Sequence, residues 1–392
     1  MKIKAQYAPN LLKVRGCLIG GAAGDALGYP IEFKGDDYIF SKYGEGGMRA
    51  YELSGGRALV SDDTQMTLFT AAGLLRHTYI AMTGKAGFTE SEYAKTVAEA
   101  YKDWYRTQMG SFEGVRREME RGAFKPSTWL SYVPELYSSR APGNTCLSAI
   151  AKGCRGTFRR AANDSKGCGG VMRVAPAGLI FPDEPMKAAI VGARCAALTH
   201  GHKLGYLPAA VLSHAVATLV GGSSASVREA IQLAMRDVTA CFGRSAALDV
   251  LDTLLQNAIR LAGTGVYSDT DCIHMLGEGW VAEEALAVAV YCSVRHQYDF
   301  ESALASAVSH GGDSDSTGAI TGNLLGAFLG IDAIPGHLVS SLEMLDVMLE
   351  LSDDIVLLSA APRHELADEV AVAMYDKYGR TVHAVYNPEN KI

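Results

Sequence analysis

The stretch HGGDSDSTGAITGNLLGAFLG, residues 310–330, joins a cluster of oxygen-bearing side chains to a long apolar segment. Two aspartates, two serines and a threonine fill residues 313–317. Every fourth position after them is a glycine: Gly318, Gly322, Gly326 and Gly330. On a helix this spacing places the glycines on one face. Because a glycine inside a helix costs about 1 kcal/mol relative to alanine, we expect this face to allow the close approach of a second buried helix.

The acidic start of this stretch has two interpretations. Asp, Ser and Thr accept hydrogen bonds from free N–H groups, so the cluster can be a solvated turn that caps a helix. A second segment with the same spacing, VRGCLIGGAAGDALG at residues 14–28, favours a buried position instead. We therefore predict two central helices, over Leu11–Gly28 and Ser316–Gly330. A membrane span is not favoured, because the second stretch is too short and the first contains Asp25.

Composition limits the class of protein. The chain has 392 residues, of which 48% are hydrophobic and 20% charged, and its net charge is −7. This charge argues against general binding of nucleic acid, which needs a basic face. The eight cysteines include no CxxC pair, which indicates reduced thiols. MKIKAQYAPN lacks the apolar core of a signal peptide, so we expect a cytoplasmic location.

Helical patterns dominate the rest of the chain, and alternating β-branched runs are scarce. We predict one all-α, multi-helix domain over residues 1–392. Apolar residues three and four apart predict four further helices, Pro185–His200, Ser245–Ala262, Glu283–Arg295 and Leu338–Leu351. For residues 376–392 we expect a short extended tail.

A second acidic cluster lies in LVSDDTQMTLFTAAGLL, residues 59–75. Ser61 has the position of a helix N-cap, with Asp62 and Asp63 in the first turn. A carboxylate at a helix N-terminus is ordinary, but two such clusters together are more informative. If they meet, their four carboxylates repel one another unless a cation lies among them. The ligands are all hard oxygen, which selects Mg²⁺ or Mn²⁺ over zinc, as one ion or a pair.

The segment SKGCGGVMRVAP, residues 165–176, has three glycines in four positions. Such a loop can turn a row of N–H groups toward a pyrophosphate, although a structural turn is the simpler alternative. Nearby basic residues favour the phosphate: Arg155, Arg159, Arg160, Lys166 and Arg173. In LTHGH, the spacing of His200 and His202 makes a two-histidine metal site improbable. His200 can neutralise a phosphate or act as a cation at the end of its helix.

Taken in order, these segments resemble the ADP-ribosylglycohydrolase family. The similarity rests on GCLIGGAAGDALGYPIEF, SDDTQMT, SKGCGGVMRVAP, LTHGH, GEGWVAEEALAVAVY and HGGDSDSTGAITGNLLGAFLG, which span residues 16–330. The paired SDDT and GGDSDS motifs are specific, whereas the glycine loop and the TH pair would not identify the family alone. The resemblance implies a compact all-α fold around two Mg²⁺ or Mn²⁺ ions.

The resemblance also assigns roles to individual residues. It implies six metal ligands: Ser61, Asp62, Asp63, Asp313, Asp315 and Ser316. It implies that Glu32 and Asp313 are catalytic. It implies substrate contacts from Asn144, Gly167, Cys168, Gly169, Gly170 and His200. Serine replaces a frequent threonine of the family at positions 61 and 316, and keeps the hydroxyl. Some members carry an acidic residue just before the position of Asn144, where this chain has Ala141 and Pro142.

The implied reaction removes ADP-ribose from a modified protein, as the dinitrogenase-reductase-activating and ADP-ribosylarginine hydrolases do. Arginine is the favoured linkage, while serine-linked and free ADP-ribose stay open. Two alternatives remain. The protein can be an immunity protein that hydrolyses the product of a toxin ADP-ribosyltransferase or blocks the toxin. It can also be a non-catalytic member that binds ADP-ribose, which the four intact aspartates argue against.

Overall fold

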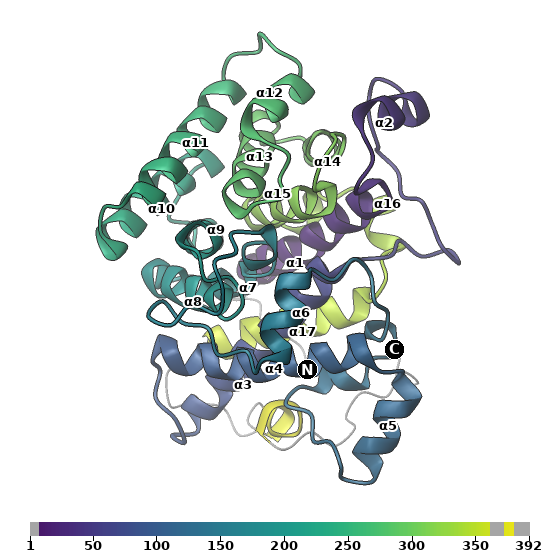
Figure 1. Cartoon of the computed structure of the whole chain (residues 1–392), viewed down its shortest axis with the longest axis vertical. Coiled ribbons are helices and arrows are strands. Elements are labelled where there is room, and N and C mark those ends of the chain that lie inside the picture. Colours follow the sequence, from purple (N-terminus) through teal and green to yellow (C-terminus); the bar gives the residue numbers. More distant parts are fainter. Residues whose placement is uncertain (1–7, 361–371, 380–392) are drawn as a thin grey trace.

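The two glycine faces meet each other in the tertiary structure. The computed structural model describes residues 8–360 and 372–379. Helices α1 (Ala8–Gly28) and α15 (Ser314–Leu329) lie side by side in the middle of the molecule (Figure 1). A methyl carbon built on Gly20 would lie 2.6 Å from the carbonyl oxygen of Gly322, and one built on Gly318 would lie 2.5 Å from that of Gly24. No side chain fits between the backbones there.

This contact fixes the relative direction of the two helices. Gly20 faces Gly322, whereas Gly24, further along α1, faces Gly318, which comes earlier in α15. The helices are therefore antiparallel, and the C-terminal end of α1 lies against the N-terminal end of α15. The prediction of two buried central helices in close glycine contact is confirmed. The sequence did not reveal that each helix is the partner of the other.

The remaining helices surround this pair, with α2 and α12 at one end of the molecule and α3 and α5 at the other (Figure 1). They are α2 (Asp36–Tyr43), α3 (Asp62–Met82), α4 (Glu90–Met109), α5 (Phe112–Glu120), α6 (Asn144–Ala151), α7 (Ala175–Ile180), α8 (Pro185–Ala197), α9 (Lys203–Val220), α10 (Val227–Phe242), α11 (Ala246–Ala262), α12 (Asp269–Leu276), α13 (Ala282–Arg295), α14 (Phe300–Val308), α16 (Gly336–Ser340) and α17 (Leu345–Ala360). The shorter turns are the 3₁₀-helices η2 (Tyr29–Ile31), η3 (Trp129–Tyr132), η4 (Pro134–Leu136), η5 (Cys168–Gly170) and η6 (Ile331–Ala333), and the π-helix η7 (Tyr375–Gly379).

The described part of the chain contains isolated β-bridges but no β-strand, so the predicted all-α class is confirmed. Its buried apolar residues form one cluster that extends from Val14 to Tyr378. One helix, α9, is long and apolar enough to cross a membrane, and 94% of it is buried inside the protein. The core helix of a globular protein has these same properties. The single-domain assignment for residues 1–392 stays a prediction.

Three of the four further helices lie close to their predicted positions, as α8, α11 and α13. Ser245 caps α11, where its hydroxyl accepts the N–H of Leu248 at 3.4 Å. The predicted helix Leu338–Leu351 is wrong, because α16 ends at Ser340 and α17 begins at Leu345. Between them, the carbonyl of Ser341 accepts the N–H of Ala58 at 2.8 Å. This pairing with a distant segment interrupts a locally helical pattern.

The tail expected for residues 376–392 is wrong where the structure describes it. The short π-helix η7 covers Tyr375–Gly379, and residues 380–392 lie outside the described part. The Tyr378 hydroxyl donates to Asp354 of α17 at 2.7 Å, and the Lys377 ammonium lies 3.0 Å from the same carboxylate. The helical turn is held by these contacts, which the local sequence does not show.

Candidate metal centre

The antiparallel contact of α1 and α15 brings three carboxylates together. Gly28, the last residue of α1, packs against the backbone of Ser314 and Asp315 at the start of α15. The chain then turns through η2 to Glu32. As a result, Glu32, Asp313 and Asp315 each offer one oxygen atom, and these atoms all lie within 4.8 Å of one another. Residues about 280 positions apart in the sequence thus share one site.

Asp25 positions the second acidic helix start. Its carboxylate accepts the backbone N–H groups of Ser61 and Thr64, both at 3.0 Å, and also the Thr64 hydroxyl. The first turn of α3 is therefore fixed to α1. Sequence reasoning assigned Asp25 no role in the site. The available signal was a charged residue inside a glycine-rich, apolar helix, and here that residue is fully buried.

The first turn of α3 has the predicted capping. Ser61 is the N-cap, and its hydroxyl accepts the N–H of Asp63 at 3.2 Å. The carboxylate of Asp62 accepts the N–H of Gly143 at 3.3 Å. On the other helix start, Ser316 donates its N–H to the Asp315 carboxylate at 2.9 Å. Both clusters are buried, and their carboxylates interact.

The pKa values of these groups reflect first their burial and then their mutual repulsion. Burial, followed by the charge of Asp315, raises the pKa of Glu32 to about 10. The same two causes raise the pKa of Asp25 to about 7. They also raise the pKa values of Asp62 and Asp63 well above the ordinary range. The charge of Asp315 thus raises the pKa values of all four of these carboxyl groups.

The donor set fits a hard divalent cation. Asp63 Oδ1 and Asp313 Oδ2 are buried and have no hydrogen-bond partner. No ion pair within residues 8–360 and 372–379 joins a lysine, arginine or histidine to Asp25, Glu32 or the four aspartates of the two helix starts. Buried carboxylates are stable when they are paired or coordinate a metal. Their oxygens are the ligands that Mg²⁺ and Mn²⁺ prefer.

The glycine loop lies beside the acidic cluster. Burial and the nearby charges of Asp313 and Asp63 raise the pKa of the Cys168 thiol in this loop. The N–H of Cys168 donates to the carbonyl of Trp280 at 3.1 Å, which holds the loop against the segment before α13. A methyl carbon on Gly169 would lie 3.2 Å from the His200 ring. The loop and His200 therefore pack together next to the carboxylates.

The positive charge expected on His200 is wrong. Burial and the nearby Arg173 guanidinium lower the pKa of His200 to about 3, so the ring is neutral at physiological pH. Its Nδ1 lies 2.9 Å from the Thr199 hydroxyl. Helix α8 also ends before it, at Ala197. A cationic role was inferred from sequence position alone, and burial removes it.

The basic residues expected around the glycine loop have other partners. Lys166 pairs with Glu283. Arg173 is fully buried and donates to Thr199 Oγ1 at 2.6 Å. Arg155 and Arg160 line a separate pocket between α4 and the end of α8. Lys166 and Arg173 thus have protein partners, and Arg155 and Arg160 belong to another pocket.

Asn144 begins α6 and is exposed, one residue after Gly143, which contacts Asp62. Arg140 orders the preceding segment. Its guanidinium pairs with Glu343, at 3.0 Å for one of the two bonds, and donates to the carbonyl of Val60 at 2.9 Å. Arg140 thus joins the loop of Asn144 to the start of α3. Sequence reasoning missed it because its partners are far away in the chain.

Phe33, the residue after Glu32, belongs to an aromatic stack. Phe33 and Trp280 are stacked, with ring centroids 5.1 Å apart and an interplanar angle of 17°. Phe33 is 70% exposed and has a φ of 66°, in the left-handed region that favours glycine. The stack connects the segment of Glu32 to the segment that holds Cys168. It was not anticipated from the sequence.

The raised pKa values predict an unusual pH dependence in the absence of a divalent cation. An unfolded carboxyl group ionises near pH 4, whereas Asp25 in the folded protein keeps its proton to about pH 7 and Glu32 to about pH 10. The folded state then binds more protons, so stability falls as pH rises through this window. Above about pH 7.5, buried His200 contributes little, because histidine is then mostly neutral in both the folded and the unfolded state.

We therefore expect the melting temperature in EDTA to decrease from about pH 7.5 to pH 9, and excess Mg²⁺ to remove most of this decrease. Differential scanning fluorimetry in the two buffers measures both effects. A melting temperature in EDTA that is constant or rises over this interval would contradict the repulsion inferred for the carboxylates.

The chain is similar to known proteins over most of its length. The family model described as ADP-ribosylglycohydrolase matches residues 8–365. The ADP-ribosyl-dinitrogen-reductase glycohydrolase of Rhodospirillum rubrum is 26% identical over 344 residues, which cover 84% of this chain and 90% of that protein. The ADP-ribosylhydrolase ARH3 of Danio rerio is 26% identical over 380 residues, which cover 90% of this chain and 92% of that protein.

A solved structure shows the same fold. It is an ADP-ribosylglycohydrolase-related protein complex that is similar to this chain with a TM-score of 0.57 and 23% sequence identity. The similarity covers 90% of this chain and 99% of the other.

Proposed function

Because the chain belongs to the ADP-ribosylglycohydrolase family, whose members are hydrolases, we propose that it removes ADP-ribose from modified arginine side chains of proteins. The observation that supports the proposal is the meeting of Glu32, Asp313 and Asp315 with the acidic start of α3, which leaves buried carboxylate oxygens without partners. We further propose that the site binds two Mg²⁺ or Mn²⁺ ions, and that the protein acts in the cytoplasm on ADP-ribosylated proteins.

The metal ligands in this proposal come from the two helix starts. They are Ser61, Asp62 and Asp63 of the α3 start, and Asp313, Asp315 and Ser316 of the α15 start. Bound cations would polarise the ribose hydroxyls and acidify a water molecule. Asp25 takes no such part: its oxygens already accept N–H groups of the α3 turn, so it fixes the position of the ligands.

The reaction exchanges one bond for another at the anomeric carbon of the distal ribose. The bond from that carbon to the guanidinium nitrogen breaks, a bond to the water oxygen forms, and the leaving guanidine keeps its proton. Glu32 accepts a proton from the water or returns one, as a general base or shuttle. The Phe33–Trp280 stack holds the backbone next to Glu32. The usual geometry of glycosidases, in which two carboxyl groups flank the scissile bond, does not apply to this proposed metal site.

The glycine loop provides the second part of the substrate site. Gly167 to Gly170 are positioned next to the carboxylates and are free of side chains except at Cys168. Their N–H groups are suited to the diphosphate of ADP-ribose. Neutral His200 packs against the loop, and Asn144 begins α6 directly after Gly143, whose N–H donates to Asp62.

One experiment tests this proposal directly. The protein is incubated with Mg²⁺ and with proteins that carry radiolabelled ADP-ribose on arginine or on serine. We expect release of label from arginine and loss of that release in EDTA. Release from serine alone would overturn the arginine assignment. Tight binding of ADP-ribose with no release from either substrate would overturn catalysis and support a non-catalytic role.

We expect Glu32→Gln to lower turnover by about 10²–10⁴-fold, the usual contribution of a general base. The affinity for Mg²⁺ should change much less, by less than about tenfold, because the amide keeps one oxygen and the aspartates stay in place. Steady-state kinetics and a Mg²⁺ titration separate the two effects. Glu45→Gln, which changes an exposed glutamate, is the matched control. Unchanged turnover in Glu32→Gln would remove Glu32 from the mechanism.

A further inference from the structure

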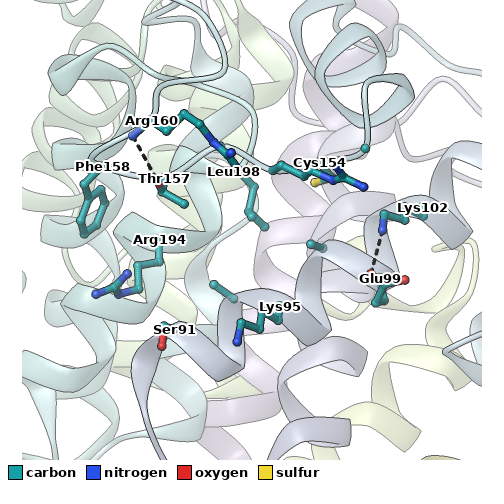
Figure 2. A pocket seen from close by; sticks show the side chains of 15 residues that line it. Ser91, Lys95, Glu99, Lys102, Cys154, Thr157, Phe158, Arg160, Arg194 and Leu198 are labelled. Carbon is teal, nitrogen blue, oxygen red and sulfur yellow. Dashed lines mark hydrogen bonds and ion pairs between the residues drawn. The ribbon is translucent and has the colours of Figure 1, made fainter.

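A pocket of about 440 Å³ lies between α4, the end of α8 and the loop of residues 153–160, and none of its lining residues belongs to the acidic cluster. Its floor is one face of α4, formed by residues three and four apart: Ser91, Ala94, Lys95, Ala98, Glu99 and Lys102. The side chains of Ala94 and Ala98 are small, which leaves space between α4 and the residues that face it. Arg194 and Leu198, at and just beyond the end of α8, form one wall, and the loop of residues 153–160 forms the other (Figure 2). This volume is in the range of small-molecule sites.

The lining of this pocket is strongly basic. Five cationic side chains line it: Lys95, Lys102, Arg155, Arg160 and Arg194. Its only carboxylate, Glu99, is paired with Lys102 at 2.7 Å (Figure 2). The other four cations have no ion pair within the portion of the chain that the structure describes. The whole protein has a net charge of −7, so this concentration of positive charge runs against its overall balance.

One of these cations is held in place and partly unsatisfied. The Arg194 guanidinium lies over the ring of Phe158, 5.1 Å from its centroid. That ring is fixed in turn by Tyr206 and Phe242, at centroid distances of 4.9 and 5.7 Å. The Nε atom of Arg194 is buried and has no hydrogen-bond partner. The aromatic contact therefore keeps the charge of Arg194 at the wall of the pocket without neutralising it.

We propose that this pocket binds a small phosphate-bearing anion, of the size of pyrophosphate or a nucleoside diphosphate. Such a ligand supplies several acceptor oxygens and two or more negative charges, which match the unpaired cations. The basic residues that the sequence places near the glycine loop gain a role here, since Arg155 and Arg160 belong to this pocket. A duplex nucleic acid is not favoured, because the basic groups line a hollow and not an extended face.

This site is separate from the proposed substrate site. None of the residues that line it belongs to the acidic cluster or to the glycine loop. The inference therefore does not depend on the proposed hydrolysis, and binding can be measured without activity.

The test is isothermal titration calorimetry of the full chain in EDTA, at about 0.15 M salt, with inorganic pyrophosphate and separately with ADP. We expect saturable binding of at least one of them. The double variant Lys95→Glu/Arg160→Glu should weaken it by about tenfold or more, because two attractive charges become repulsive. Arg159→Glu is the matched control, since this neighbouring exposed arginine does not line the pocket. It should change the affinity by less than about twofold, because salt screens distant surface charges.

Tighter binding of ADP than of pyrophosphate would identify a nucleotide as the ligand type, and equal binding would show that the phosphates alone are recognised. Both results support the proposal. Three results would overturn it: no binding of either anion at millimolar concentration, affinity unchanged in the double variant, or equal weakening by Arg159→Glu. Circular dichroism of each variant excludes loss of fold, which is not expected because Lys95 and Arg160 are exposed.

Discussion

Replacing Asp315 with alanine is expected to abolish hydrolysis while the protein stays folded. Asp315 contributes one of the three carboxylate oxygens that lie within 4.8 Å of one another. Its charge also raises the pKa values of Asp25, Glu32, Asp62 and Asp63. It is therefore the central ligand of the proposed metal site, and no neighbouring side chain can replace it. Activity in saturating Mg²⁺ should fall to the level of a reaction without enzyme.

The same change should make the protein more stable when no divalent cation is bound. Removing the shared charge relieves the repulsion that raises the pKa values of the neighbouring carboxyl groups. In EDTA near pH 8 the melting temperature of Asp315→Ala should thus exceed that of the unaltered protein. Addition of Mg²⁺ should stabilise the unaltered protein and have little effect on the variant.

The matched control is Asp332→Ala, which removes an exposed aspartate just beyond the other end of α15. It should alter neither activity nor the response to Mg²⁺. Full activity of Asp315→Ala, or of the unaltered protein in excess EDTA, would contradict the metal site. A variant that is inactive and also much less stable in EDTA would show that Asp315 supports the fold instead.

Gly322→Leu is expected to have the largest effect on stability. A methyl carbon at this position would overlap the backbone of Gly20, including its carbonyl oxygen. The overlap is with main-chain atoms of a buried helix, which cannot rotate away as a flexible side chain can. Helix α1 or α15 must therefore shift. We expect a loss of at least about 1–3 kcal/mol in the free energy of unfolding, the typical cost of overpacking.

The shift should also weaken metal binding, although Gly322 lies more than a helical turn from the carboxylates. Helix α15 begins at Ser314, so any displacement of it moves Asp315 relative to Glu32 and to the start of α3. Metal ligands tolerate placement errors of only about half an ångström. Urea denaturation and a Mg²⁺ titration measure the two consequences separately.

Gly336→Leu makes the same substitution where a side chain would meet nothing within 4 Å. It should change stability by less than about 0.5 kcal/mol, as surface substitutions usually do. If Gly322→Leu leaves both the unfolding midpoint and the Mg²⁺ affinity unchanged, the tight contact between the two glycine faces is not a structural requirement.

The sequence by itself determined several of the helices and the residue types at their ends. The spacing of apolar residues predicted α8, α11 and α13, and the Ser61 cap followed from local hydrogen-bonding chemistry. These features depend on residues a few positions apart, so a local pattern contains them. The sequence also showed that the glycine faces need a close partner, because isolated glycines would only weaken a helix. The resemblance to the family added the expected ligand set.

The break between α16 and α17 was decided by the tertiary structure. The local pattern is helical there, but Ala58 pairs with Ser341 from far away in the chain. The neutral state of His200 was decided in the same way, since burial and Arg173 lower its pKa to about 3. Burial is a property of the assembled core, and a single segment does not contain it.

The candidate metal site depends most clearly on the tertiary structure. Local patterns gave two acidic helix starts, but only the antiparallel contact of α1 with α15 brings Glu32 to Asp315. The hydrogen bonds of Asp25 fix the start of α3 at the same place. The basic pocket likewise joins side chains of α4 to a loop some 60 residues later. The sequence specified the chemical groups, whereas long-range packing set the distances between them, because those distances depend on contacts between segments that are remote in the chain.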